Sequence, residues 1–155
     1  MENLARQTTV RIQTAKSSGS GTIVRRQGYT YTLLSNWHVM AIVRGDRTIV
    51  TGDGLLHRRL GVPRRLEDTD RAIVEFCRAI EYKVAPSSAE PAAVPEPLRS
   101  AGFPAGAQAW AVARGFVELL LPKSLPHLYS LGYTNEVKMG MSGGPIFSQR
   151  FLGWD

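Results

Sequence analysis

The decapeptide K-M-G-M-S-G-G-P-I-F, at Lys138–Phe147, places Ser142 among three glycines. Glycines at this density indicate a backbone that turns tightly or lies close to another part of the chain. A serine hydroxyl on such a turn, beside the backbone N–H groups of Gly140 and Ser142, has the groups that acyl transfer requires. The oxygen attacks a carbonyl, and the N–H groups stabilise the negative charge that develops. A plain glycine turn before a short strand at Pro145–Phe147 explains the same residues equally well, so the rest of the chain has to decide.

The length and composition bound the fold. The chain has 155 residues, which fits one domain or two small lobes that share a site. Hydrophobic residues make up 43% of it, enough to fill a core, and 15 glycines with 9 prolines are typical of strands joined by loops. The net charge of +6 arises in residues 1–84, where 14 basic residues stand among 8 acidic ones. Because the two signs are interspersed, this pattern favours a solvated surface over a phosphate-binding block.

The sequence gives no sign of a metal, a cofactor or a membrane span. Cys77 is the only cysteine, which excludes an internal disulfide and a cysteine-based metal site. It follows the apolar run Ile73–Phe76, where a buried free thiol is expected. The opening residues M-E-N-L-A-R lack the pattern of a secretory signal peptide, and no apolar run is long enough to cross a bilayer. As written, the chain is expected to be soluble and to stay where it is made.

Short runs with alternating polarity or many β-branched side chains recur through the first half of the chain. They predict antiparallel strands, and the lack of a sustained helical period favours a small barrel or sandwich. Residues 1–7 are compatible with a helical turn, Ser17–Gly21 predicts a turn, and Gly52-Asp53-Gly54 is typical of a hairpin. The predicted strands are Thr8–Gln13, Thr22–Arg26, Tyr29–Leu34, Thr48–Thr51, Leu55–Leu60 and Arg71–Phe76, with a less regular run at Glu81–Val84.

A proline-rich segment divides the chain. Ala85–Pro97 contains four prolines and is predicted to be a linker between residues 1–84 and residues 98–155. Beyond it, the sequence predicts a G-F-P turn within Leu98–Gly106, two strands hinged at Gly115 within Ala107–Leu121, and a strand at Leu128–Tyr133.

Three residue types suited to nucleophilic catalysis follow one another along the chain. A serine needs a base to activate it, and the base needs a group to orient it. His38, Asp70 and Ser142 appear in that order, each at the end of a predicted strand. A histidine considered alone is more often a surface or core residue, as His57 and His127 illustrate, and an acid at a strand start commonly caps a turn. The joint occurrence of all three favours a catalytic constellation.

The segments S-N-W-H-V, D-R-A-I-V-E-F and G-M-S-G-G-P resemble the histidine, aspartate and serine motifs of chymotrypsin-fold, trypsin-like serine proteases. The closest likeness is to the bacterial branch that includes secreted glutamyl endopeptidases and high-temperature-requirement proteases. Supporting likenesses are G-S-G-T-I-V at Gly19–Val24, G-F-P at Gly102–Pro104 and Y-T-N at Tyr133–Asn135. Together they span nearly the whole chain in the order that the family has.

The resemblance implies an all-β fold of two antiparallel β-barrels of the chymotrypsin type, with the site in the cleft between them. The first barrel, residues 1–84, would carry His38 and Asp70, and the second, residues 98–155, would carry Ser142. The implied activity is that of a serine endopeptidase acting on polypeptides without a metal or cofactor. Ser142 attacks the scissile carbonyl, His38 moves the proton, Asp70 orients the imidazole, and the N–H groups of Gly140 and Ser142 form the oxyanion hole.

The sequence departs from the family at three places. Met141 stands where activated trypsin relatives carry an acid that pairs with a new N-terminus, so activation by that route is not expected. Arg71 follows Asp70 where the family usually has an apolar residue, which points to a more exposed strand. Only 13 residues follow Ser142, whereas the family has further strands that close the second barrel and wall the specificity pocket. We therefore expect an incomplete second barrel and low or no peptidase activity.

Two other functions stay open at this stage. A catalytically inactive, protease-like module would bind peptides, and replacing Ser142 would leave its function intact. A basic β-barrel would bind nucleic acid with an affinity that falls steeply with salt, but aromatic residues are only 8% of the chain and do not interleave with the arginines. The family likeness points to secretion or the periplasm, whereas the opening residues show no signal peptide. Substrate specificity and oligomeric state are not predicted.

Overall fold

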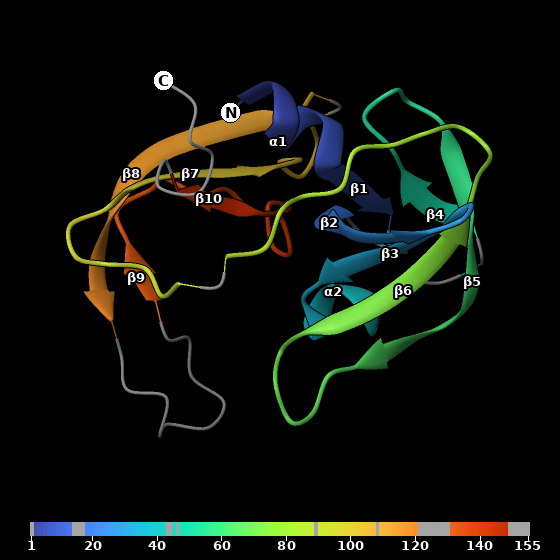
Figure 1. Cartoon of the computed structure of the whole chain (residues 1–155), viewed down its shortest axis with the longest axis horizontal. Coiled ribbons are helices and arrows are strands. Elements are labelled where there is room, and N and C mark those ends of the chain that lie inside the picture. The colour runs from blue at the N-terminus through green and yellow to red at the C-terminus, as the bar shows by residue number, and fades with distance from the viewer. Residues whose placement is uncertain are drawn as a thin grey trace.

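The computed structural model describes residues 2–13, 18–42, 45, 47–88, 90–107, 109–120 and 131–148. They form a closed six-stranded antiparallel barrel and a separate four-stranded antiparallel sheet. Figure 1 shows the barrel and the sheet side by side, with the segment that joins them crossing from one to the other. A closed barrel followed by a second, partial sheet confirms the predicted all-β fold of the chymotrypsin double-barrel type.

The chain builds the barrel first and the second sheet afterwards. A short helix, α1 (Glu2–Thr8), leads directly into the barrel, and α2 (Trp37–Met40) lies between its third and fourth strands. In the order β1-β2-β3-β6-β5-β4, the barrel strands are β1 (Thr9–Gln13), β2 (Ser18–Gln27), β3 (Thr30–Ser35), β6 (Ala72–Cys77), β5 (Leu56–Arg65) and β4 (Arg47–Val50). In the order β10-β7-β8-β9, the second sheet has β10 (Ile146–Ser148), β7 (Pro97–Gly102), β8 (Ala111–Leu120) and β9 (Leu131–Tyr133).

The barrel core follows from the two-residue period of its strands. In β3 every second side chain is buried, and Tyr31 and Leu33 are fully enclosed. Tyr31 is opposite Phe76 of β6, and their rings stack with centroids 5.2 Å apart. Because alternate strand residues face the same side, this pattern could be read from the sequence. The core is completed mainly by Val10, Ile12, Ile23, Ile49 and Val74.

Two glycine-rich segments that the sequence assigned to a turn and a hinge are continuous strand. β2 begins at Ser18 and includes most of the predicted turn, and β8 passes through Gly115 unbroken. At both places the glycine permits a close contact. A Cβ atom at Gly19 would lie 2.3 Å from Cγ1 of Val39, and one at Gly115 would lie 2.4 Å from Oδ1 of Asn135. The predicted turn and hinge were therefore wrong, and what requires glycine at both places is packing between segments.

Three further predictions differ from the structure. Cys77 is exposed instead of buried, because it follows the inward-facing Phe76 and therefore points out of the barrel. Residues 81–84 form no strand, and β5 continues to Arg65, beyond the predicted end at Leu60. The described part of the predicted strand at Leu128–Tyr133 is β9, while residues 121–130, including His127, lie outside the described residues.

A polar cluster surrounds the buried His57. Its Nε2 lies 2.8 Å from Oγ1 of Thr51 and 3.1 Å from the hydroxyl of Tyr82. Both hydroxyls donate to the carboxylate of Asp53, so Nε2 of the neutral ring carries the proton that they accept. Burial lowers the pKa of His57, and Arg78 lowers it further, although Asp53 raises it. His57 is therefore a satisfied core histidine.

The lowered pKa of His57 predicts a loss of stability in mild acid. Protonation favours the unfolded chain, where the histidine pKa is near 6.5. The contribution of neutral His57 to the free energy of unfolding should therefore be complete above about pH 6.5. It should be lost as the pH drops toward the lower pKa of the folded state. Urea denaturation measured across this window should give a falling midpoint for the native protein.

The matched variant is His57→Gln, which should have a nearly flat midpoint across the same window. The carboxylates of Glu2 and Asp53 do not interfere there, because the pKa of each lies below its ordinary value, 4.5 for Glu2 and 3.8 for Asp53. A midpoint that falls as steeply in His57→Gln as in the native protein would show that another group causes the loss.

The first helix and the end of the linker are both attached to the second sheet. Glu2 of α1 is bonded to Arg99 of β7 at 3.1 Å and to Arg114 of β8 at 2.6 Å, and Ala5 belongs to the apolar cluster of that sheet. The buried carboxylate of Glu96 accepts bonds from the hydroxyl of Ser148 and from the N–H of Ala93. Among the described residues, no helix has both the length and the apolar character needed to cross a membrane.

Candidate active site

The pairing of β3 with β6 brings the predicted histidine and aspartate together. Ser35, at the end of β3, is opposite Ala72, at the start of β6, so the residues just outside both strands meet at one edge of the barrel. The backbone carbonyl of Asp70 accepts bonds from the amide of Asn36 at 2.9 Å and from the N–H of Trp37 at 3.1 Å. These two bonds fix the start of α2 against the strand that follows Asp70.

The carboxylate of Asp70 holds His38 at two points. Its Oδ2 lies 2.7 Å from Nδ1 of the imidazole, and its Oδ1 accepts the backbone N–H of the same residue at 2.8 Å. Because an ionised carboxylate can only accept, Nδ1 of the neutral ring carries the proton and Nε2 presents its lone pair. About half of the His38 side chain is exposed to solvent, so this lone pair is accessible.

The serine turn is shaped by its glycines. Gly140 and Gly143 have φ angles of 92° and 86°, in the region that favours glycine. A Cβ atom at Gly143 would lie 2.1 Å from Oγ of Ser35 and 3.1 Å from the backbone nitrogen of Asn36. The turn therefore packs directly against the segment that precedes His38. Both interpretations of the glycines hold, since the backbone turns tightly and also approaches the barrel closely.

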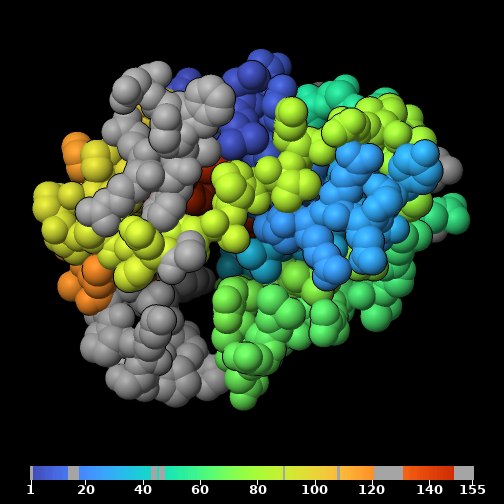
Figure 2. All heavy atoms as spheres, in the orientation of Figure 1, coloured from blue at the N-terminus to red at the C-terminus, as the bar shows by residue number. Residues whose placement is uncertain are grey.

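Ser142 is exposed on this turn and lines a cavity of about 640 Å³ between the barrel and the second sheet. The same cavity is lined by Asn36, which lies two residues before His38, and by Arg71, which directly follows Asp70. The structure thus brings His38 and Asp70 into direct contact and places Ser142 beside the segment that carries them. One wall of the cavity is formed by residues 85–88, and Figure 2 shows this yellow-green segment running between the two halves of the molecule.

The N–H groups of Gly140 and Ser142, which were predicted to form the oxyanion hole, share one property. Within the described part of the chain, neither group donates a hydrogen bond to a protein acceptor. Unpaired donors beside a nucleophile suit an oxygen that gains negative charge during reaction. The carbonyls of the same two peptide groups are bonded, because that of Met141 accepts the N–H of Gly144 and that of Met139 accepts the N–H of Ala105.

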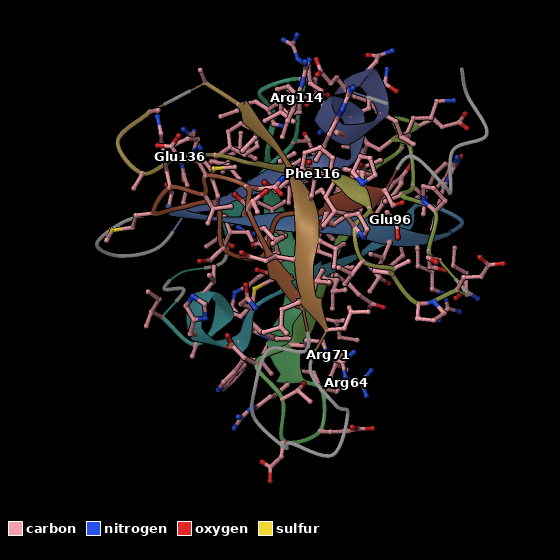
Figure 3. The ribbon with its side chains drawn as sticks, turned by 90° about the vertical axis from the view of Figure 1, so that its left-hand side faces the viewer. Arg64, Arg71, Glu96, Arg114, Phe116 and Glu136 are labelled. Carbon is pink, nitrogen blue, oxygen red and sulfur yellow. The ribbon has the colours of Figure 1, made fainter. Side chains whose placement is uncertain are left out.

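The charged residues along the cavity wall are both basic. Arg71 and Lys138 are the charged side chains among the described residues that line it. Figure 3 shows Arg71 beside Arg64 of the neighbouring strand β5.

The Asp70 side chain is one-third exposed. The described residues contain no group of three His, Cys, Asp or Glu side chains that could hold a metal ion.

The sequence did not single out Ser20, Ser35 and Asn36 as parts of the site. Ser20 lies inside the G-S-G-T-I-V segment and Asn36 inside S-N-W-H-V, so the family likeness was the available signal. Their contacts join parts of the chain that are far apart in sequence, which residue types alone do not reveal.

A family model described as a trypsin-like peptidase domain matches residues 19–151. The chain belongs to the trypsin-like peptidase family. The match includes the histidine, the aspartate and the serine turn in a single domain. A search of curated proteins finds no match.

Solved structures support the fold of this family member. The chain is similar to the inactive form of a serine-to-alanine mutant of Rv3671c from M. tuberculosis H37Rv, with a TM-score of 0.70 and 19% identity over 93% of this chain and 70% of that chain. It is also similar to the inactive form of the Rv3671c protease, with a TM-score of 0.72 and 18% identity over 93% of this chain and 73% of that chain. At these identities the likeness concerns the fold.

Proposed function

We propose that this member of the trypsin-like peptidase family is a serine endopeptidase that uses His38, Asp70 and Ser142. The observation that carries the proposal is the two-point hold of the Asp70 carboxylate on His38, at 2.7 and 2.8 Å. This contact selects the tautomer that a general base requires. The packing of the serine turn against Asn36, two residues before the histidine, supports the place of Ser142 in the same site.

The proposed reaction follows from these groups. A polypeptide enters the cavity, and the Ser142 oxygen attacks its carbonyl carbon while Nε2 of His38 takes the hydroxyl proton. The N–H groups of Gly140 and Ser142 stabilise the oxyanion of the tetrahedral intermediate. The imidazolium, stabilised by Asp70, then gives its proton to the leaving amine, and an acyl-enzyme forms. Water, activated by the same imidazole, releases the acid product and restores the serine.

We also propose the finer assignments that follow from the motifs. Residues 1–84 and 98–155 would form the two halves of the enzyme, joined by residues 85–97. The likeness of G-S-G-T-I-V and Y-T-N supports a place in the bacterial branch that includes glutamyl endopeptidases and high-temperature-requirement proteases. Two arginines of the basic first half have structural partners, since Arg59 donates to the carbonyls of Gly45 and Gly61 and Arg65 donates to that of Thr69.

A fluorophosphonate probe tests the proposed nucleophile. The proposal predicts one covalent adduct per molecule, which mass spectrometry of the digested protein should place on Ser142. Such an adduct would show that the low or absent activity expected from the incomplete second barrel is wrong. Heat-denatured protein is the control, because an unfolded serine is not activated. Absence of an adduct in the folded protein would refute the proposed chemistry. Binding of unmodified peptides by such a protein would then identify it as a protease-like peptide-binding module.

A further inference from the structure

Ser20 of β2 is fully buried and all of its polar atoms are bonded. Its N–H donates to the carbonyl of Ser142 at 2.9 Å, and its hydroxyl lies 2.8 Å from the carbonyl oxygen of Gly140. The same hydroxyl accepts the N–H of Phe103 at 2.8 Å, and the carbonyl of Ser20 accepts the hydroxyl of Ser35 at 2.7 Å. Because Phe103 donates to the Ser20 oxygen, the hydroxyl proton is directed to Gly140.

The peptide group that the hydroxyl holds has a special position in the serine turn. The N–H groups of Gly140 and Ser142 belong to two peptide groups, and the group between Gly140 and Met141 separates them. The angles ψ of Gly140 and φ of Met141 join this planar middle group to its two neighbours, so holding its carbonyl in one direction restricts both angles. The Ser20 hydroxyl donates to the carbonyl of this middle group, which belongs to Gly140, and the Ser20 N–H donates to the carbonyl of Ser142.

The glycine in the turn makes this restraint necessary. Gly140 has a φ of 92° and no side chain, so its backbone can adopt several conformations at little cost. The carbonyl of Met139 is held by Ala105, that of Met141 is held by Gly144, and the carbonyl between them is held by Ser20 alone. Among the described residues, no other side chain donates to the carbonyl of Gly140.

From this geometry we infer that Ser20 is a positioning residue, whose hydroxyl fixes the peptide group between Gly140 and Met141 so that the two flanking N–H groups converge on one oxyanion. The inference rests on the proposed function, since it assigns those N–H groups to the tetrahedral intermediate. It also identifies a direct bond from the barrel to the catalytic turn of the second half.

The variant Ser20→Ala removes the hydroxyl and leaves the Ser20 backbone bonds in place. We expect kcat to fall by roughly 10²-fold, the scale of losing or misplacing one oxyanion donor, with little change in KM. Thr9→Val is the matched control, because it also removes a fully buried hydroxyl that bonds a backbone carbonyl, that of Ala5, away from the site. It should retain the native kcat.

A transition-state analogue separates positioning from general damage. A peptidyl trifluoromethyl ketone forms a tetrahedral adduct whose oxygen would occupy the oxyanion hole, whereas the product peptide from the amine side of the cleaved bond has no oxygen at that position. In Ser20→Ala, affinity for the ketone should fall by the same factor as kcat/KM, while affinity for the product peptide should be unchanged. A native kcat, or an equal loss of both affinities, would overturn the inference. If Ser20→Ala does not fold, Ser20→Cys, with a weaker donor, should give an intermediate kcat.

A further measurement keeps this inference separate from the proposed function. If the native protein forms no fluorophosphonate adduct, the proposed function fails, and the role of Ser20 is then measured by amide hydrogen exchange. In Ser20→Ala the amides of Met141 and Gly144, which donate to the carbonyls of Lys138 and Met141, should exchange faster, while those of β1 should keep their native rates. Native exchange rates throughout the serine turn would refute the positioning role whatever the activity of the protein.

Discussion

Replacement of Ser142 by alanine is expected to lower kcat for peptide hydrolysis by roughly 10⁶-fold, because no other described group on the turn can form the acyl-enzyme. The exposed position of Ser142 on a turn fixed by glycine contacts means that removing its oxygen should not disturb the fold. Steady-state kinetics on a fluorogenic peptide, with thermal unfolding as a check of folding, measures both quantities.

The same experiment has an internal control in His38. If the two residues act as a unit, His38→Ala should cost about as much as Ser142→Ala, and the double variant should cost little more than either single variant. Multiplicative losses would mean that the residues act independently, and they would contradict the proposed nucleophile–base pair.

Asp70→Asn is expected to lower kcat by about 10⁴-fold with an unchanged fold. The asparagine oxygen can still accept the N–H of His38, which Oδ1 of Asp70 now accepts at 2.8 Å. Its amide group would face Nδ1, where Oδ2 now lies at 2.7 Å. Because an amide N–H donates, it selects the tautomer with the proton on Nε2, which cannot accept the proton of Ser142.

The control for the aspartate variant is Asp68→Asn, which makes the same change of charge in the turn before β6. It should retain kcat to within a few-fold, since Asp68 does not hold His38. Nuclear magnetic resonance of the imidazole nitrogens would report the tautomer directly. An Asp70→Asn variant that keeps the native tautomer and the native kcat would assign the orientation of His38 to its backbone contacts instead.

The strands of the barrel could be predicted because their pattern is local. The alternation of apolar and polar residues in β1, β3 and β6 fixes which side chains fill the core, as Tyr31 and Phe76 show. Gly19 and Gly115 were interpreted as parts of a turn and a hinge. What requires glycine there is close contact with Val39 and Asn135, which lie elsewhere in the sequence. A contact of that kind has no local signature.

The residues of the candidate site also divide into those that the sequence indicated and those that only long-range contacts reveal. Residue types and their order pointed to His38, Asp70 and Ser142. The structure brings the first two into contact, while Ser142 lies on a turn that packs against Ser35 and Asn36. The exposure of Cys77 could also have been predicted from the sequence. Successive side chains of a strand point to opposite faces, so Cys77 points outward where Phe76 points into the core. The role of Ser20 could not, since it depends on bonds that cross 83 and 120 residues of chain.

The position of α1 has a consequence for dividing the protein into fragments. This helix begins the chain that forms the barrel, yet Glu2 and Ala5 contact the second sheet. A cut within residues 85–97 would therefore leave one piece with Glu2 and Ala5 of this helix uncovered. The other piece would have an uncovered apolar patch and would leave Arg99 and Arg114 without their carboxylate partner. The two pieces would be complementary halves of a split protein, suited to joint expression and reassembly rather than to separate purification.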